Sequence, residues 1–236
     1  MERNELVLLR LSNQYLLHAG ERMRVLCAMN GFQAQFLSNA LHAMRLRSTA
    51  YDTAHAADSL VKSWTLRGTM HIFAEADLPL FLHTGCRYRS RDWTVPSFWN
   101  QRPNWALTPK RQAYFSDLII DALAQGPMTR EALKARCRAA GMTQAEEGSI
   151  FHPWGGGIRE LCERGFLCGT VSEEKAFRLC PAFTPMEEQD ALLEQTRRYF
   201  TNYGPASIRD AAYYFGSSQA EIKKRLARLP MKAAEY

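Results

Sequence analysis

Two glutamines separated by one residue, Gln33-Ala34-Gln35, form the short pattern in this chain that is best suited to chemistry. A glutamine amide offers both a carbonyl acceptor and an NH₂ donor. Two of them can therefore orient a water molecule and stabilise positive charge growing on a sugar. Glutamine is not a strong general base, so such a pair suffices only where the leaving group is already good. The pattern is short, and the alternative is that both side chains are surface residues of a helix without a function.

The spacing of the two glutamines makes a demand on the backbone. Residues two apart point about 200° apart on a helix, whereas they share a face in extended chain. If Gln33 and Gln35 act on one site, the next helix should not begin until about Phe36. The preceding Asn30-Gly31 favours a turn at this point.

A second suggestive stretch runs from Trp64 to His71 and reads WTLRGTMH. Arg67 can bind a phosphate or can pin the loop by bonding backbone carbonyls, and Gly68 permits a positive φ or a close backbone approach. His71 lies in an apolar, strand-like run, where a lone histidine is more often structural than catalytic.

Apolar spacing predicts short helices over 6–19, 21–30, 36–47 and 53–63, followed by a strand pair. This is the order expected of a winged helix, with 53–63 in the recognition position. Lys62 would then be a phosphate contact late in that helix. Arg45 and Arg47 end the helix 36–47, where cations favour the helix dipole even without DNA.

The rest of the chain repeats the pattern. A second unit has helices over 109–124, 129–140 and 157–164, with strands over 165–171 and 176–179; the third has helices over 187–201, 207–215 and 218–229 but no hairpin. The expected fold is mainly α with short β-hairpins, made of tandem winged-helix units of which the third is incomplete. The expected domains are 1–86, a connector 87–108, 109–185 and 186–236.

The predicted connector is rich in tryptophan and arginine. Its Trp and Arg side chains can line DNA by stacking and by phosphate contact. The favoured interpretation is that they hold this loop onto its own protein.

The composition favours a polyanionic partner without requiring one. The net charge is +6 and the pI about 9.1. The stretch from His42 to Arg111 contains ten Lys/Arg and five acidic residues. Neutralising phosphates releases counterions and so favours binding. The six cysteines have no paired spacing, the N-terminus does not resemble a signal peptide and no apolar run is long enough for a membrane helix. We expect a cytoplasmic protein without a metal site.

Residues 31–35, the helix ending in Arg45 and the stretch 64–71 together resemble the signature of the AlkZ-like DNA glycosylases. Tyr203-Gly204-Pro205-Ala206 is similar to the start of that family's third winged helix. Relatives of the YcaQ type carry Asp at the second motif position, so Gln35 is closer to the AlkZ branch.

The resemblance implies a monofunctional DNA glycosylase that hydrolyses the N-glycosidic bond of cationic N7-alkylpurines, including bulky or interstrand-crosslinked lesions. It implies that Gln33 and Gln35 are catalytic, that no cofactor or metal is needed, and that the protein is a monomer acting on double-stranded DNA. The expected DNA-binding residues are Arg45, Arg47, Lys62, Arg67, Thr69 and His71.

Two alternatives remain at this stage. A winged-helix transcription regulator would bind DNA without catalysis, because fold does not settle function. A chain with a shortened third unit could also have lost its activity.

Overall fold

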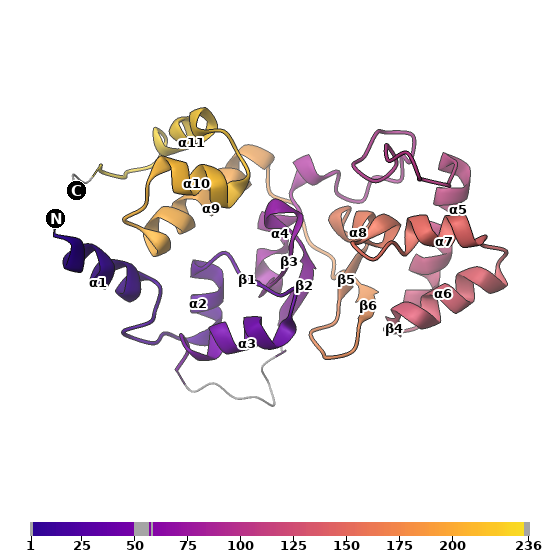
Figure 1. The fold of residues 1–236 in the computed structure, drawn as a ribbon, viewed down its shortest axis with the longest axis horizontal. Coiled ribbons are helices and arrows are strands. Elements are labelled where there is room, and N and C mark those ends of the chain that lie inside the picture. Colours follow the sequence, from indigo (N-terminus) through magenta and orange to yellow (C-terminus); the bar gives the residue numbers. More distant parts are fainter. Residues whose placement is uncertain (1, 50–56, 58, 234–236) are drawn as a thin grey trace. The chain divides into compact units, whose positions relative to one another are not determined.

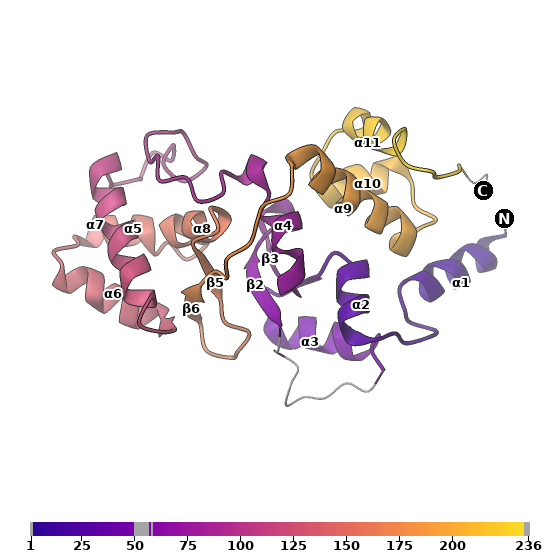
Figure 2. The ribbon, with the colours of Figure 1, turned by 180° about the vertical axis from the view of Figure 1, so that it is seen from behind.

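The computed structural model describes residues 2–49, 57 and 59–233 and divides the chain into two compact units (Figures 1 and 2). Unit 1 contains residues 1–84 and 183–236, and unit 2 contains residues 85–182. The predicted third segment therefore packs with the first, and the predicted connector belongs to the same unit as the second. Helices predominate, with short antiparallel strands in each unit, as the sequence predicts.

Unit 1 is built from helices of both its sequence segments around a three-stranded sheet. Its helices are α1 (Arg3–Asn13), α2 (Arg22–Ala28), α3 (Leu37–Arg45), α4 (Leu78–Phe81), α9 (Glu188–Tyr203), α10 (Ile208–Phe215) and α11 (Gln219–Leu226). Its strands are β1 (Phe32–Gln33), β2 (Leu60–Trp64) and β3 (Met70–Ala74), with single 3-10 turns at Leu66–Gly68 and Glu75–Asp77, and a further 3-10 turn, Thr84–Cys86, spans the boundary with unit 2. Both β1 and β2 pair with β3 in antiparallel fashion.

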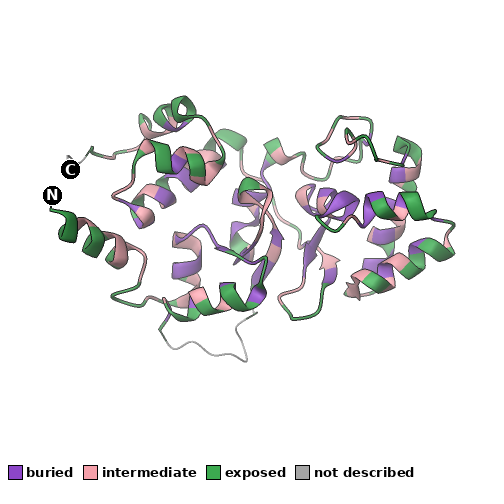
Figure 3. Cartoon of the chain, in the orientation of Figure 1, coloured by how far each residue is buried: buried purple, intermediate pink, exposed green. Residues whose placement is uncertain are grey.

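Two clusters hold unit 1 together. Phe73 of β3 packs on Phe81 of α4, with 4.7 Å between ring centroids. Tyr199, Ala211 and Ile222 join α9, α10 and α11, which lie against one another in both ribbon views. In contrast, α1 has no buried residue and is mostly exposed in Figure 3.

Unit 2 has the same order of a short strand, helices and a strand pair. Its helices are α5 (Pro109–Leu123), α6 (Arg130–Ala139), α7 (Gln144–Ile150) and α8 (Gly156–Glu163), and its strands are β4 (Met128–Thr129), β5 (Leu167–Gly169) and β6 (Ala176–Leu179). Both β4 and β5 pair with β6 in antiparallel fashion. Thr108 caps α5 by accepting a hydrogen bond from the Arg111 amide, with Pro109 at the first position, which is the arrangement that the sequence indicates.

The predicted helix 53–63 is wrong where the structure describes it. Residues 60–64 are strand β2, and Lys62 lies in the middle of that strand, opposite Ile72. The β-branched Val61 and the aromatic Trp64 favour a strand, and pairing with β3 satisfies the backbone polar groups. Residues 53–56 and 58 lie outside the described part of the chain.

The segment 87–108 forms no helix or strand and is held down by its own tryptophans. Trp93 and Trp99 are only 5% and 2% exposed. The guanidinium of Arg164 stacks over the Trp93 ring at 4.2 Å and donates to the carbonyls of Ser90 and Asp92. This confirms the interpretation that the segment is fastened to its own protein.

Candidate active site

The two glutamines lie on extended backbone between β1 and α3. Gln33 ends β1, α3 does not begin until Leu37, and both glutamines are exposed whereas Ala34 between them is fully buried. The Ala34 amide donates to the Met70 carbonyl at 2.7 Å, which holds the motif against β3. The predicted start of the helix at about Phe36 is confirmed, and the two amides share one face of the chain.

A turn of fixed geometry precedes this segment. Asn30 and Gly31 both adopt positive φ, at 56° and 75°. A Cβ on Gly31 would lie 2.5 Å from the Ile72 carbonyl oxygen, so only glycine fits between α2 and the sheet here. The turn therefore brings the backbone of β1 directly onto β3.

Strand β3 brings His71 to the motif, and Thr69 immediately precedes this strand. His71 lies directly opposite Gln33 in the register, and the Ala34–Met70 hydrogen bond extends the contact between the two segments by one residue. His71 is only 4% exposed and its Nδ1 lies 3.0 Å from the Thr69 carbonyl oxygen. Burial lowers the pKa of His71 to about 4, with a smaller lowering by the nearby Arg67 charge. The imidazole is therefore neutral at pH 7.

Arg67 stands at the tip of the β2–β3 hairpin. Both Arg67 and Gly68 have positive φ, at 54° and 65°, as the glycine predicts. The Arg67 side chain is exposed and its guanidinium lies over the Tyr214 ring of α10 at 5.4 Å. Among the described residues no backbone carbonyl accepts a hydrogen bond from Arg67, and its contact in the structure is the one with Tyr214.

The other predicted basic residues are placed differently. Arg45 is exposed in the last turn of α3, whereas Arg47 is half-buried, donates to the Ala43 carbonyl at 2.9 Å and stacks over the Phe32 ring at 5.6 Å. Lys62 directly precedes Ser63, which lies opposite His71 in the sheet. Because successive side chains of a strand alternate between its two faces, the Lys62 side chain lies on the face opposite to that of Gln33. The structure thus places His71 opposite Gln33 and the Thr69 carbonyl against the His71 ring, and it separates Lys62 from them.

Sequence reasoning predicted a helix over 187–201, which is α9, but missed that this helix supports the residues ahead of the motif. The carbonyls of Cys27, Ala28 and Met29, at the end of α2, accept hydrogen bonds from Arg198, Asn202 and Tyr203 of α9 at 2.9, 2.9 and 3.2 Å. Asn30 donates from its side chain to the Gln195 carbonyl at 3.0 Å. Four consecutive residues just ahead of the motif are therefore bonded to α9.

A buried ion pair fixes this contact. Arg198 binds both carboxylate oxygens of Asp77 at 2.7 and 2.9 Å, and the two side chains are 15% and 7% exposed. Burial alone would lower the pKa of Arg198, but the Asp77 and Glu194 carboxylates outweigh it and raise the pKa. No local signal in the sequence could have found these partners, because they are separated by more than a hundred residues.

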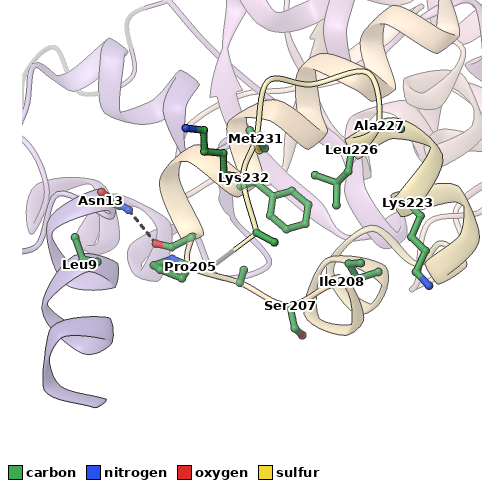
Figure 4. Close-up of a pocket in the computed structure, with 14 residues that line it drawn as sticks. Leu9, Asn13, Pro205, Ser207, Ile208, Lys223, Leu226, Ala227, Met231 and Lys232 are labelled. Carbon is green, nitrogen blue, oxygen red and sulfur yellow. Dashed lines mark hydrogen bonds between the residues drawn. The ribbon is translucent and has the colours of Figure 1, made fainter. Parts of the chain in front are cut away.

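One cleft of unit 1 lies away from the motif. It has a volume of about 730 Å³ and is formed by α1, the end of α9, the 204–208 segment, α11 and residues 231–233 (Figure 4). Asn13 donates across it to the Gly204 carbonyl at 2.9 Å. Gln33 and Gln35 do not line this cleft and are exposed. Within the described residues, no group of three or more His, Cys, Asp or Glu side chains could hold a metal ion, and no helix is long and apolar enough to cross a membrane.

Comparisons with known proteins agree on one family. The profile described as DNA glycosylase AlkZ-like matches residues 26–234. The chain is 30% identical over 195 residues to an interstrand DNA cross-link repair glycosylase of Streptomyces sahachiroi, covering 75% of this chain and 50% of that protein. It thus spans about half the length of this curated relative. The solved structure of Streptomyces sahachiroi DNA glycosylase AlkZ superimposes with a TM-score of 0.73 at 23% identity, over 98% of this chain and 66% of that one, which shows a common fold.

Proposed function

We propose that this chain, which belongs to the AlkZ-like DNA glycosylase family, hydrolyses the N-glycosidic bond of cationic N7-alkylpurines in double-stranded DNA. The observation that carries the proposal is the exposed pair Gln33 and Gln35 on either side of the buried Ala34. Both amides face the same side of an extended segment, which suits joint action on one atom.

The proposed chemistry follows from what amides can do. A carbonyl oxygen of Gln33 or Gln35 accepts a hydrogen bond from a water molecule and directs the water's lone pair at C1′. The same carbonyl dipoles stabilise positive charge that develops on the sugar. An N7-alkylated purine already carries a positive charge, so it leaves as a neutral base and needs little acid–base assistance.

The open position of the motif bears on the size of the lesion. Base-flipping enzymes usually enclose the target base in a tight pocket. The two glutamines lie exposed on an extended segment, which suits bulky or interstrand-crosslinked bases. The relative's name, an interstrand cross-link repair glycosylase, points the same way.

We also propose that the repeated topology represents winged-helix units that hold DNA by its phosphates. In each unit the first short strand and the second strand both pair with the third, which is the strand order of that fold. Arg45 and Arg67 are exposed near the motif and are the proposed phosphate contacts, with Thr69 and His71 beside the glutamines. The activity is proposed for a monomer that needs no cofactor.

The test is release of free N7-methylguanine from alkylated duplex DNA. We expect release by the unaltered protein and a loss of about 100-fold or more in Gln33→Ala and Gln35→Ala, since such preorganised groups are typically worth that much. Gln125→Ala, which changes an exposed glutamine of unit 2, is the matched control and should keep full activity. Binding of DNA without release would support a regulator instead, and rapid excision of uracil would contradict the requirement for a cationic base.

A further inference from the structure

A polar rung crosses the three strands of unit 1 beside the motif. Gln33 lies opposite His71, and His71 lies opposite Ser63 of β2. Directly opposed side chains of antiparallel strands share a face of the sheet. The rung therefore runs from an exposed glutamine through a buried histidine to a buried serine.

The register brings Gln33 and His71 close together. The Ala34 amide bonds to the Met70 carbonyl, and pairs of the two kinds alternate along an antiparallel ladder. Gln33 and His71 are therefore a non-hydrogen-bonded pair, the kind in which Cα atoms lie about 4.5 Å apart and side chains approach most closely. A glutamine amide reaches the far edge of an imidazole across this distance.

The imidazole has one nitrogen left for this contact. A carbonyl oxygen can only accept, so His71 Nδ1, which lies 3.0 Å from the Thr69 carbonyl, carries the hydrogen. Nε2 of a neutral imidazole then bears a lone pair and can only accept. Burial keeps the ring neutral, since the pKa of His71 is lowered to about 4.

We infer that His71 is a positioning residue for Gln33: its Nε2 accepts a hydrogen bond from the Gln33 NH₂ group and so turns the Gln33 carbonyl toward the attacking water. This inference rests on the proposed function. The hydrogen bond to His71 fixes the orientation of the Gln33 amide. An amide that can flip would present its donor and its acceptor to the water in turn. We assign this bond to the complex with DNA, because catalytic hydrogen bonds often form fully only there.

The test compares two substitutions that each keep one ring nitrogen's role. In His71→Asn the amide nitrogen takes the place of Nδ1 and retains the Thr69 bond, but no acceptor remains at Nε2. In His71→Gln an amide oxygen can take the place of Nε2, and the Thr69 bond is lost. We expect His71→Asn to lower the single-turnover excision rate about tenfold or more, the value of one well-placed hydrogen bond, with unchanged affinity for alkylated duplex. His71→Gln should retain most of the rate.

If His71 had only a structural role, only its Nδ1 hydrogen bond would matter. His71→Asn would then keep more of the excision rate than His71→Gln. A His71→Asn protein with the full rate, or a His71→Gln protein as slow as His71→Asn, would overturn the inference. Should His71→Gln melt below the assay temperature, His71→Ala with added imidazole makes the same comparison, with rescue expected. Ser63→Ala is the matched control on the other side of His71: its hydroxyl is buried without a hydrogen-bond partner among the described residues, and its loss should leave the rate unchanged.

The tautomer gives a readout that does not depend on activity. Imidazole ¹⁵N chemical shifts at pH 7 should show His71 neutral with hydrogen on Nδ1, and hydrogen on Nε2 would overturn the inference. If the unaltered protein released no alkylpurine while these shifts were as expected, the failure would lie with the proposed function alone.

Discussion

The connection between the first short strand and the helix that follows it differs between the two units. In unit 2, β4 runs into α6 without a break, and Thr129 caps the helix by accepting a hydrogen bond from the Ala132 amide at 3.1 Å. In unit 1 three residues separate β1 from α3, and Phe36 at the N-cap position makes no side-chain cap. The registers correspond, since Thr129 lies opposite Ala176 as Gln33 lies opposite His71.

The difference shows how a common framework can be turned toward chemistry. In unit 2 the second residue of the short strand, Thr129, caps the helix that follows. Its counterpart in unit 1, Gln33, caps no helix and is exposed. The missing cap costs α3 about 1 kcal/mol. In unit 1, α3 is less stable than a capped helix, but the segment before it presents two amides on one face.

The largest expected effect comes from the buried arginine of each unit. Arg198→Met leaves Asp77 buried without its partner, and Arg164→Met does the same to Glu160, whose side chains are 7% and 5% exposed. Each should lower the free energy of unfolding by about 3–5 kcal/mol, measured by urea denaturation. Only Arg198→Met should also slow excision by the folded protein, since Arg198 holds the end of α2. Equal slowing in both folded variants would mean that the motif does not depend on α9.

A smaller effect is expected at the glycine ahead of each short strand. Gly31→Ala places a Cβ 2.5 Å from the Ile72 oxygen at a positive φ, whereas a Cβ on Gly126, also at positive φ, meets nothing within 4 Å. We expect Gly31→Ala to lower stability by about 3 kcal/mol and Gly126→Ala by only about 1 kcal/mol. Thermal melting measures both. Similar losses at the two positions would show that the close approach of β1 to β3 is not tight.

The smallest expected effect is a pH dependence that unit 2 lacks at the corresponding position. The pKa of His71 falls from 6.5 to about 4 on folding, so between these values the unfolded chain binds a proton that the folded chain does not. Stability is therefore lost as pH falls from about 6.5 toward 4, by at most about 1.4 kcal/mol per pH unit. His71→Gln should remove this slope, seen as a stability difference from the unaltered protein that changes by about 2 kcal/mol between pH 7 and pH 5. Ala176→Gln in unit 2 should leave the slope in place; an unchanged slope in His71→Gln would refute the low pKa.

Local signals account for what the sequence could predict. The spacing of Gln33 and Gln35 required extended backbone, and Thr108, Pro109 and Thr129 marked the starts of α5 and α6, all as observed. The helix predicted over 53–63 is wrong at 60–63 because the apolar spacing there does not distinguish a helix from a strand, and pairing with β3 decides for the strand.

The support behind the site could not be predicted because it is entirely non-local. The backbone carbonyls that accept hydrogen bonds from Arg198, Asn202 and Tyr203 carry no sequence signal, and neither does the pairing of Arg198 with Asp77. Their hydrogen bonds join residues 171 to 174 positions apart. The sequence thus predicted which side chains form the motif and how its backbone runs, but not what holds it.

The hydrogen bonds from α9 to the end of α2 also determine when, during synthesis, the residues ahead of the motif can be held in place. Residues 27–30 leave the ribosome early, yet their partners follow 165 to 174 residues later. At synthesis rates of roughly 5–20 residues per second, the motif waits on the order of 10–30 s for the helix that holds it. Unit 2, continuous in sequence from 85 to 182, has been synthesised in full before unit 1 can close.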